Sequence, residues 1–205
     1  GSDGSDTIFA GLGDDFIGGG GGADLIYGSA GSNVIYGGLG GDTVQGGTGS
    51  DTIYGGGPER NQLFGNDGGD FITEGSAGEY MAGGTGNDTI YGGVGNDTIY
   101  LGADNDFVGG GDGADVIFAG AGANRIFGGL GNDTIHAGTG KDVMTGGVPG
   151  ADVFVFASAA AIGIGTARDV ITDFTAGVDD IDLRPLGTTF NASGLLGGGT
   201  KSFFY

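Results

Sequence analysis

Residues 83–91 read Gly-Gly-Thr-Gly-Asn-Asp-Thr-Ile-Tyr, and residues 128–136 read Gly-Gly-Leu-Gly-Asn-Asp-Thr-Ile-His. In each phrase glycines come first, an aspartate is sixth and a large aliphatic residue is eighth. The eighth residue recurs along the chain every nine residues, with one residue inserted beside Pro58 and one beside Pro149. Its seventeen members are Ile8, Ile17, Ile26, Ile35, Val44, Ile53, Leu63, Ile72, Met81, Ile90, Ile99, Val108, Ile117, Ile126, Ile135, Met144 and Phe154. So long a run at one short period predicts a solenoid.

An acid or an amide holds the sixth position of every repeat. These residues are Asp6, Asp15, Asp24, Asn33, Asp42, Asp51, Asn61, Asp70, Glu79, Asp88, Asp97, Asp106, Asp115, Asn124, Asp133, Asp142 and Asp152. The glycines before them supply backbone conformations with positive φ, which other residues adopt only at a cost. The β-branched or aromatic residues after them favour a short strand whose middle side chain points inward. Each repeat is therefore half a coil of a two-sheet parallel solenoid, and the fold class is all-β.

The composition excludes several classes of protein. Glycine makes up 55 of 205 residues, but without the every-third spacing and the abundant proline of collagen. With no cysteine, a disulfide scaffold and a thiolate metal site are excluded. A net charge of −20 makes nucleic acid a poor partner, and no stretch approaches 18 apolar residues, so we expect no membrane span.

The aspartates must be explained as a group. Stacked coils place the sixth residue of one repeat about 4.8 Å from that of the next coil, and like charges in register are destabilising. Lysine and arginine do not alternate with them. Carboxylates with exposed backbone carbonyls form a hard oxygen set that suits Ca²⁺ better than Mg²⁺, which requires a tighter octahedron. The alternative is that aspartate only terminates turns, which leaves the repulsion unanswered.

The repeats resemble those of the repeats-in-toxin (RTX) family, whose nonapeptide Gly-Gly-x-Gly-x-Asp-x-aliphatic-x forms a calcium-binding parallel β-helix. The resemblance covers residues 1–156 and implies a right-handed β-roll with Ca²⁺ between successive coils, in at most about 15 sites. The expected ligands are the aspartates at the sixth positions, Asn33 and Asn124, and turn glycines exemplified by Gly84, Gly86, Gly93, Gly95, Gly129 and Gly131.

Some turns depart from the pattern. An amide keeps one oxygen but loses the charge, and Glu79 follows a turn, Glu74-Gly75-Ser76-Ala77-Gly78, that lacks most of the motif. The Asn61/Glu79 pair is therefore our candidate for a weak or missing site. Leu101 and Asp104 replace expected glycines, which puts the turn before Asp106 in doubt.

Folding should depend on the metal. Without Ca²⁺ the aspartates repel one another, and so glycine-rich a chain loses much conformational entropy on folding. The RTX resemblance implies secretion by a type I system of a Gram-negative bacterium, with folding in extracellular calcium. The leading function is a calcium-dependent folding and export module of a larger extracellular protein.

Residues 157–205 lose the motif and form the expected C-terminal cap. The segments 168–174 and 177–183 resemble the capping region of serralysin-type proteases, and Ile171, Phe174, Ile181 and Leu183 should cover the last coil. Asp179, Asp180 and Asp182 either bind another Ca²⁺ or form a solvated turn. The chain starts at the first position of a repeat, without Met, and ends at Phe203-Phe204-Tyr205, so we expect an incomplete cap and a piece of a longer protein.

We expect no catalysis. The zinc-binding His-Glu-x-x-His of serralysins is absent, and the single His136 is expected on the outer surface. The repeat already accounts for the carboxylates that might form a glycosidase pair.

Aromatic residues on the outer faces leave a second function open. The expected positions are Phe16, Tyr36, Tyr54, Phe71, Tyr91, Phe107 and Phe127 on one sheet, and Tyr27, Phe64, Tyr80, Tyr100 and Phe118 on the other. They either shield short strands or pack on a missing N-terminal domain or another roll. The second reading gives a structural or adhesive protein whose calcium-loaded rolls associate. Ice binding is less favoured, because the flanking residues vary too much for a flat, regular array.

Overall fold

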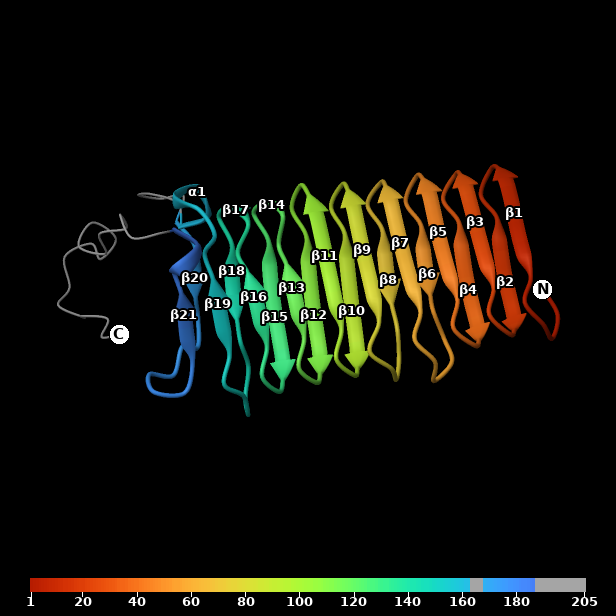
Figure 1. Cartoon of the computed structure of the whole chain (residues 1–205). Helices are drawn as coiled ribbons and strands as arrows, with labels where there is room; N and C mark the ends of the chain where they lie inside the picture. Colours follow the sequence, from red (N-terminus) through yellow and green to blue (C-terminus); the bar gives the residue numbers. More distant parts are fainter. Residues whose placement is uncertain (163–167, 187–205) are drawn as a thin grey trace.

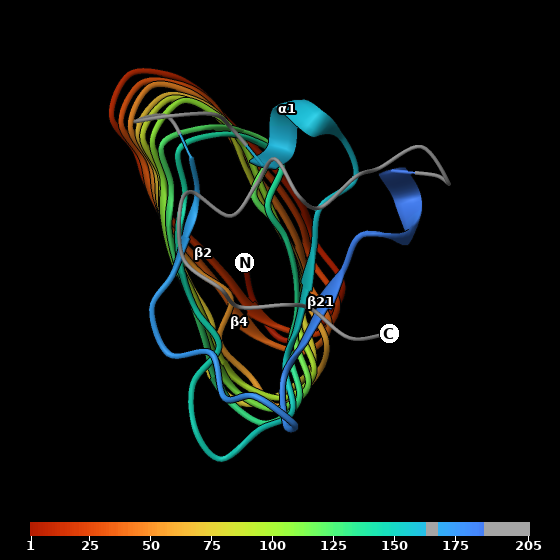
Figure 2. The same cartoon turned by 90° about the vertical axis from the view of Figure 1, so that its left-hand side faces the viewer.

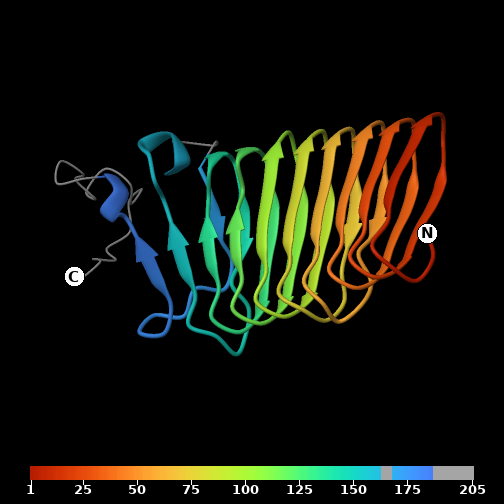
Figure 3. The same cartoon turned by 45° about the vertical axis from the view of Figure 1, so that its right-hand side comes forward.

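The computed structural model describes residues 1–162 and 168–186, which form a solenoid of two parallel sheets (Figure 1). Successive strands alternate between the sheets, so that each sheet is built from every second repeat. Viewed along the axis, the coils superimpose as a flattened ring (Figure 2), and an oblique view shows their strands stacked side by side (Figure 3). This architecture confirms the predicted parallel β-roll.

A ten-strand sheet contains the strands of the odd-numbered repeats, followed by one strand from the segment after residue 156. In order it comprises β1 (Thr7–Leu12), β3 (Leu25–Ala30), β5 (Thr43–Thr48), β7 (Gln62–Asp67), β9 (Tyr80–Thr85), β11 (Thr98–Ala103), β13 (Val116–Phe118), β16 (Thr134–His136), β19 (Val153–Val155) and β21 (Asp180–Asp182).

A nine-strand sheet faces it. In order it comprises β2 (Phe16–Gly21), β4 (Val34–Leu39), β6 (Thr52–Tyr54), β8 (Phe71–Thr73), β10 (Thr89–Val94), β12 (Phe107–Asp112), β15 (Arg125–Leu130), β18 (Val143–Thr145) and β20 (Val170–Ile171). Strands β14 (Ala121–Gly122) and β17 (Thr139–Gly140) form a separate pair in the turns.

The register reproduces the period of the sequence. Ile8 pairs with Ile26 and Ile17 with Ile35, so one coil is two repeats of nine residues. The insertion beside Pro58 lengthens one coil by a residue, since Val44 pairs with Leu63, and the insertion beside Pro149 does the same at Ile135 and Phe154. Both insertions are absorbed in turns, and the strands on either side keep their inward faces.

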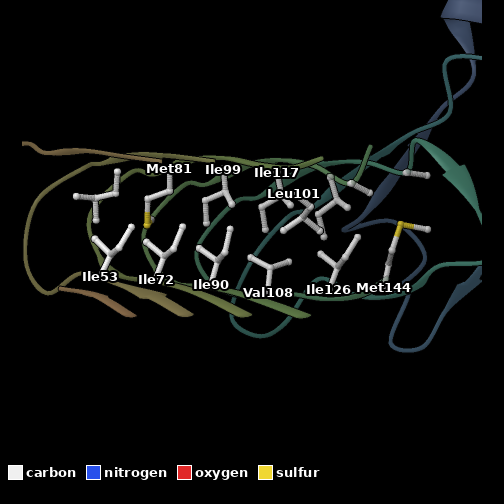
Figure 4. Packing of buried hydrophobic residues seen from close by; sticks show 14 of the residues in the cluster. Ile53, Ile72, Met81, Ile90, Ile99, Leu101, Val108, Ile117, Ile126 and Met144 are labelled. Atoms are coloured by element: carbon white, nitrogen blue, oxygen red, sulfur yellow. The ribbon is translucent and has the colours of Figure 1, made fainter. Parts of the chain in front are cut away.

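The eighth residues form the core. From Ile26 to Met144 all of them are fully buried. Figure 4 shows them in two facing rows, with Ile72 and Ile90 in one and Met81 and Ile99 in the other. Burying an aliphatic side chain of this size contributes about 1.5–3 kcal/mol. Contact between these two rows of buried side chains holds the two sheets together.

The strands are longer than the sequence analysis predicted. Most contain six residues, because the ladder continues through the glycines of the next repeat. Gly84 shows why glycine is needed there. Its φ is +120°, and an added methyl group would collide with the carbonyl oxygen of Asn66, one coil earlier. The close stacking of coils therefore requires both the conformation and the small size of glycine.

Both sheets extend past residue 156, the boundary predicted between roll and cap. Val153 pairs with Asp180 and Met144 with Ile171, at an offset of 27 residues. The longer offset arises because helix α1 (Ala159–Ile162) and residues 163–167 come between the strands. Of the predicted capping residues, Ile171, Ile181 and Leu183 pack against the core, whereas Phe174 is 37% exposed, with its ring centroid 6.5 Å from that of the core residue Phe154.

Two buried residues and one half-buried residue of the last coil were not predicted to cap it. Phe156 is 6% exposed and Ala161 in α1 is 2% exposed, and Ile162 packs beside them. A short 3-10 helix, η2 (Arg184–Leu186), ends the described chain. Residues 203–205 lie outside the described residues. Within residues 1–162 and 168–186, no helix has both the length and the apolar character that a membrane crossing needs.

The outer faces carry two aromatic ladders. On the nine-strand sheet, neighbouring rings form a row from Phe16 to Phe127 with centroids 4.7–6.3 Å apart; Tyr36 and Tyr54 are stacked and the other pairs are tilted. On the ten-strand sheet the ladder runs from Phe64 to His136, whose ring lies 4.3 Å from that of Phe118. His136 is thus on the outward side of its strand, as predicted, but it is half-buried by stacking, and this burial lowers its pKa.

Candidate metal centres

The sixth residues form two columns, one along each edge of the roll. The first edge holds the turns that lead from the nine-strand sheet to the ten-strand sheet, and the second edge holds the return turns. On the first edge the column is Asp6, Asp24, Asp42, Asn61, Glu79, Asp97, Asp115, Asp133 and Asp152. On the second edge it is Asp15, Asn33, Asp51, Asp70, Asp88, Asp106, Asn124 and Asp142.

One carboxylate oxygen of each column aspartate from Asp24 onward accepts a backbone N–H. The N–H of Asp70 donates to Oδ1 of Asp88 at 2.8 Å, and the N–H of Asp88 donates to Oδ1 of Asp106 at 2.8 Å. The same bond links successive sixth residues on both edges, except between Asn61 and Glu79. This ladder orients every aspartate side chain along the roll axis.

The other carboxylate oxygen is buried without a hydrogen-bond partner. This holds for Oδ2 of Asp15, Asp24, Asp42, Asp51, Asp70, Asp88, Asp97, Asp106, Asp115, Asp133, Asp142 and Asp152. An unpaired buried carboxylate is costly, and natural structures pair such groups or coordinate a metal with them. In the described chain the single ion pair is between Arg184 and Asp182, so lysine and arginine do not neutralise the columns.

The free oxygens point into a repeated cradle. We use this term for the space bounded by three groups: the first glycine of a repeat, Oδ2 of the same repeat's aspartate, and the carbonyl oxygen of the first residue in the repeat one coil later. At Gly37, an added methyl group would lie 2.6 Å from Oδ2 of Asp42 and 2.5 Å from the Gly55 carbonyl oxygen. The two oxygens therefore converge on one point that only a glycine leaves open.

Nine first glycines have the free aspartate oxygen within this space. The aspartates concerned are Asp24, Asp42, Asp51, Asp70, Asp88, Asp97, Asp115, Asp133 and Asp152. In the first eight the carbonyl oxygen of the next coil is also within reach. Carboxylate and carbonyl oxygens are the ligands that Ca²⁺ prefers, so the residues present fit that ion.

The electrostatics of the metal-free columns point the same way. Burial raises the pKa of Asp88, Asp106, Asp115 and Asp142 to about 7, and that of Asp42, Asp70, Asp133 and Asp169 to about 6. The backbone N–H bond opposes the shift in each case, and at most of these residues neighbouring carboxylates add to it. Without a cation these sites therefore hold protons more tightly than a solvated aspartate does.

The turn glycines proposed as ligands have a definite place. Gly84, Gly86, Gly93, Gly95, Gly129 and Gly131 hold the second and fourth positions, all with positive φ. The carbonyl oxygens that share the cradles with the free carboxylate oxygens belong instead to first-position residues such as Gly55 and Gly83. Sequence reasoning did not single these out, although the doubled glycine of the motif was the signal. Ligation by the second and fourth glycines stays a prediction. No group of three or more His, Cys, Asp or Glu side chains that could hold a metal occurs among the described residues.

The amide positions differ from the aspartates. Oδ1 of Asn124 accepts the Asp106 N–H at 2.9 Å, while its Nδ2 donates to the Ala119 carbonyl at 3.0 Å. Oδ1 of Asn33 likewise accepts from Asp15, and its Nδ2 donates to Oδ1 of Asp51 at 2.9 Å. Both amides present a donor where aspartate presents a free acceptor. This geometry does not favour the cation expected at Asn33 and Asn124.

The turn before Asp106 keeps its path despite two unusual residues. Leu101 points inward and is fully buried, and Asp104 adopts a φ of +76° in place of glycine. In the following coils the first position on this edge is occupied by Ala119 and Ala137, which are also fully buried, and then by Phe156. Side chains therefore fill the cradles of this part of the second edge, although Oδ2 of Asp106 and Asp142 remains without a partner.

The last coil adds a column member that sequence reasoning missed. Oδ1 of Asp169 accepts the Asp142 N–H at 2.8 Å, and its Oδ2 is buried without a partner. The signal was the spacing of Asp169 to Ile171, which repeats that of sixth to eighth positions. Asp173 closes the turn beside it, because its carboxylate accepts the N–H groups of Gly146 and Gly147.

The three acids suggested as one further calcium site do not act together. Asp179 extends the first-edge column, since its Oδ1 accepts the Asp152 N–H and its Oδ2 accepts the Thr175 N–H. Asp182 pairs with Arg184 at 2.8 Å, which lowers its pKa to about 2. Asp180 is exposed.

Comparison with known families agrees with this geometry. The model of the RTX calcium-binding nonapeptide repeat matches four times, over residues 1–35, 36–72, 75–108 and 109–148. These matches cover well over half of the chain. A comparison with curated proteins found no match.

Proposed function

Because the chain belongs to the family of RTX calcium-binding nonapeptide repeat proteins, we propose that it is a module that folds when it binds Ca²⁺ outside the cell. The observation that carries the proposal is the double row of buried aspartate oxygens without a partner. Nine cradles filled with divalent ions would bring eighteen positive charges to a chain of net charge −20. Calcium binding would thus remove most of the charge that opposes folding.

The dependence of folding on Ca²⁺ is also compatible with export of the unfolded chain. Extracellular calcium modules commonly bind at about 10⁻⁴–10⁻³ M. A module in this range stays unfolded in the low-calcium cytosol, passes through a type I secretion system of a Gram-negative bacterium, and folds on arrival. Its folding then supports a larger extracellular protein of which this chain is a part.

A calcium titration followed by far-UV circular dichroism, with Mg²⁺ as control, tests the proposal. We expect a cooperative transition from coil to β-structure near millimolar Ca²⁺, because each coil stabilises its neighbours. Mg²⁺ should not replace it, since the cradles offer carbonyl and carboxylate oxygens to a large ion rather than a tight octahedron. A β-signal that persists in excess EDTA would contradict a metal-dependent fold.

We propose a non-catalytic role for this chain. From Asp24 onward each column aspartate already has one oxygen bound to a backbone N–H, and His136 is stacked against Phe118. These groups are therefore committed to holding the coils together. Any chemistry of the full-length protein would then reside in another part of it.

A second candidate is a structural or adhesive protein whose calcium-loaded rolls associate. The exposed aromatic rings of the first two strands favour it, since Phe16 is 78% exposed and Phe9, which stacks on Tyr27, is 71% exposed. Farther along, however, the rings shield one another. Sedimentation of the calcium-loaded sample distinguishes the two, because only association through these faces predicts calcium-dependent oligomers.

A further inference from the structure

The turn before Asn61 departs from every other turn of the roll. Along both columns the N–H of a sixth residue donates to the side chain one coil later, up to Asp169 and Asp179. Among the described residues this ladder is interrupted once, between Asn61 and Glu79. The strands there stay paired, and the Tyr80 N–H donates to the Asn61 carbonyl at 3.1 Å. The interruption is therefore confined to the side chains.

Glu74 occupies the cradle of this turn. It stands at the first position of its own repeat, where glycine is usual, and its side chain is buried, with 9% exposed. Its Oε2 lies where an added methyl group on Gly55 would be placed. Gly55 is the first glycine of the Asn61 repeat, so this carboxylate lies at the point where a cation would be held in an ordinary turn.

Hydrogen bonds hold Glu74 in place. Its Oε2 accepts from Nδ2 of Asn61 at 2.6 Å, and its Oε1 accepts the Gly75 N–H at 2.7 Å. Nδ2 of Asn61 also donates to the Gly56 carbonyl at 3.1 Å, while its Oδ1 accepts the Asp42 N–H at 2.7 Å. The two roles of Oδ1 and Nδ2 fix the orientation of the amide, which is fully buried.

We propose that the Glu74 carboxylate, held by the Asn61 amide, takes the place of calcium in this turn, so that the coil closes there without a cation. This inference rests on the calcium-binding function proposed above. The amide N–H group supplies the electropositive partner that a metal ion would supply elsewhere, and the carboxylate bridges from one coil to the next. Both residues are needed for this arrangement. With aspartate at position 61, its carboxylate would face that of Glu74 without a donor between them.

Glu79 belongs to the following site. Glu74 is the first residue of the Glu79 repeat, so its Cβ lies in the Glu79 cradle while its carboxylate reaches the Gly55 cradle. The Glu79 N–H donates to Oδ1 of Asp97 at 2.7 Å. Both Glu79 carboxylate oxygens are buried without a hydrogen-bond partner, and burial together with the Asp97 carboxylate raises the pKa of Glu79. They therefore do not provide a cation site at Asn61.

The test is a count of bound calcium ions by native mass spectrometry. The Asn61→Asp/Glu74→Ala double variant should bind one ion more than the wild type. The alanine removes the carboxylate from the Gly55 cradle but keeps a Cβ in the Glu79 cradle, so that a single site is opened. Asn61→Asp alone should bind no additional ion and should unfold at lower urea concentration.

The matched control is Asn61→Asp with Glu59→Ala. Glu59 is exposed in the same turn, so this variant has the same charge change without opening the cradle. It should gain no ion. An extra ion in Asn61→Asp alone, or none in the folded Asn61→Asp/Glu74→Ala variant, would overturn the proposal. A wild type that binds no calcium would instead overturn the proposed function, and this inference with it.

A crystal structure of the calcium-loaded wild type gives a second test that needs no variant. We expect an anomalous calcium peak beside Asp42 and none between Gly55 and Asn61. A peak between Gly55 and Asn61, with Glu74 turned away or ligating it, would show that calcium and not the Asn61 amide neutralises this carboxylate.

Discussion

At the scale of single residues, the two oxygens of each aspartate have different roles. Oδ1 accepts a backbone N–H and sets the orientation, and Oδ2 is left free in the cradle. The difference between Asp and Asn is therefore small for the fold and large for the metal. Asparagine keeps the Oδ1 bond and presents a donor in place of the free acceptor, as Asn124 does towards the Ala119 carbonyl.

This reasoning predicts the effect of Asp115→Asn. The variant should bind one calcium ion fewer, because Oδ1 still accepts the Asp97 N–H while Oδ2 and its charge are lost. Native mass spectrometry with a calcium titration measures both number and affinity. Asp112→Asn removes the same charge from an exposed side chain and should leave the count unchanged. Equal counts for Asp115→Asn and the wild type would show that Oδ2 is not a ligand.

At the scale of elements, a repeat consists of a strand and a turn that share their glycines. The first glycine leaves space for the cradle, and the second and fourth allow the positive φ and the close stacking of coils. Side chains at the first position change what a turn does. Leu101, Ala119 and Ala137 add apolar packing, whereas Glu74 adds a hydrogen-bonded bridge.

Gly84→Ala tests the requirement for stacking. We expect a loss of about 1–3 kcal/mol in the free energy of unfolding, because alanine is strained at a φ of +120° and meets the Asn66 carbonyl. Urea unfolding at saturating Ca²⁺ measures it. Gly18→Ala is the control, since nothing lies within 4 Å of an added methyl there, and it should change stability by less than about 0.5 kcal/mol. Equal effects of the two variants would contradict the stacking argument.

At the scale of the whole molecule, stability depends on how the two columns are neutralised. Protons are an alternative to calcium, because burial raises the pKa of Asp88, Asp115 and Asp142 to about 7 from an ordinary value of 3.8. Groups whose pKa is raised by folding stabilise the folded state when protonated. This stabilisation is complete below about pH 4 and is lost as the pH rises through about 7.

The metal-free protein should therefore gain β-structure on acidification. We expect the far-UV circular dichroism signal in EDTA to change from coil towards β between pH 7 and pH 4. With saturating Ca²⁺ the signal at pH 7 should already be that of the folded form. A metal-free sample that loses β-structure as the pH falls over this range would contradict neutralisation by protons.

Much of this architecture could be predicted from the order of residues. The nine-residue period specifies the inward face, and two repeats per coil specify that Ile8 pairs with Ile26. The acid at each sixth position then has to stack in columns. These conclusions follow because neighbours in a regular solenoid are separated by a constant number of residues, so local spacing and spatial contact carry the same information.

Where the period is interrupted, only the tertiary structure was informative. The bridge from Glu74 to Asn61 joins residues 13 apart, and Asp169 follows Asp142 by 27 residues. The sequence by itself determined a two-sheet roll with columns of acids and a suspect turn at Asn61. The structure decided which oxygen of each acid is free, which carbonyl faces it and what fills the irregular turn. These depend on side-chain directions and on how far one coil reaches into the next, which a spacing does not encode.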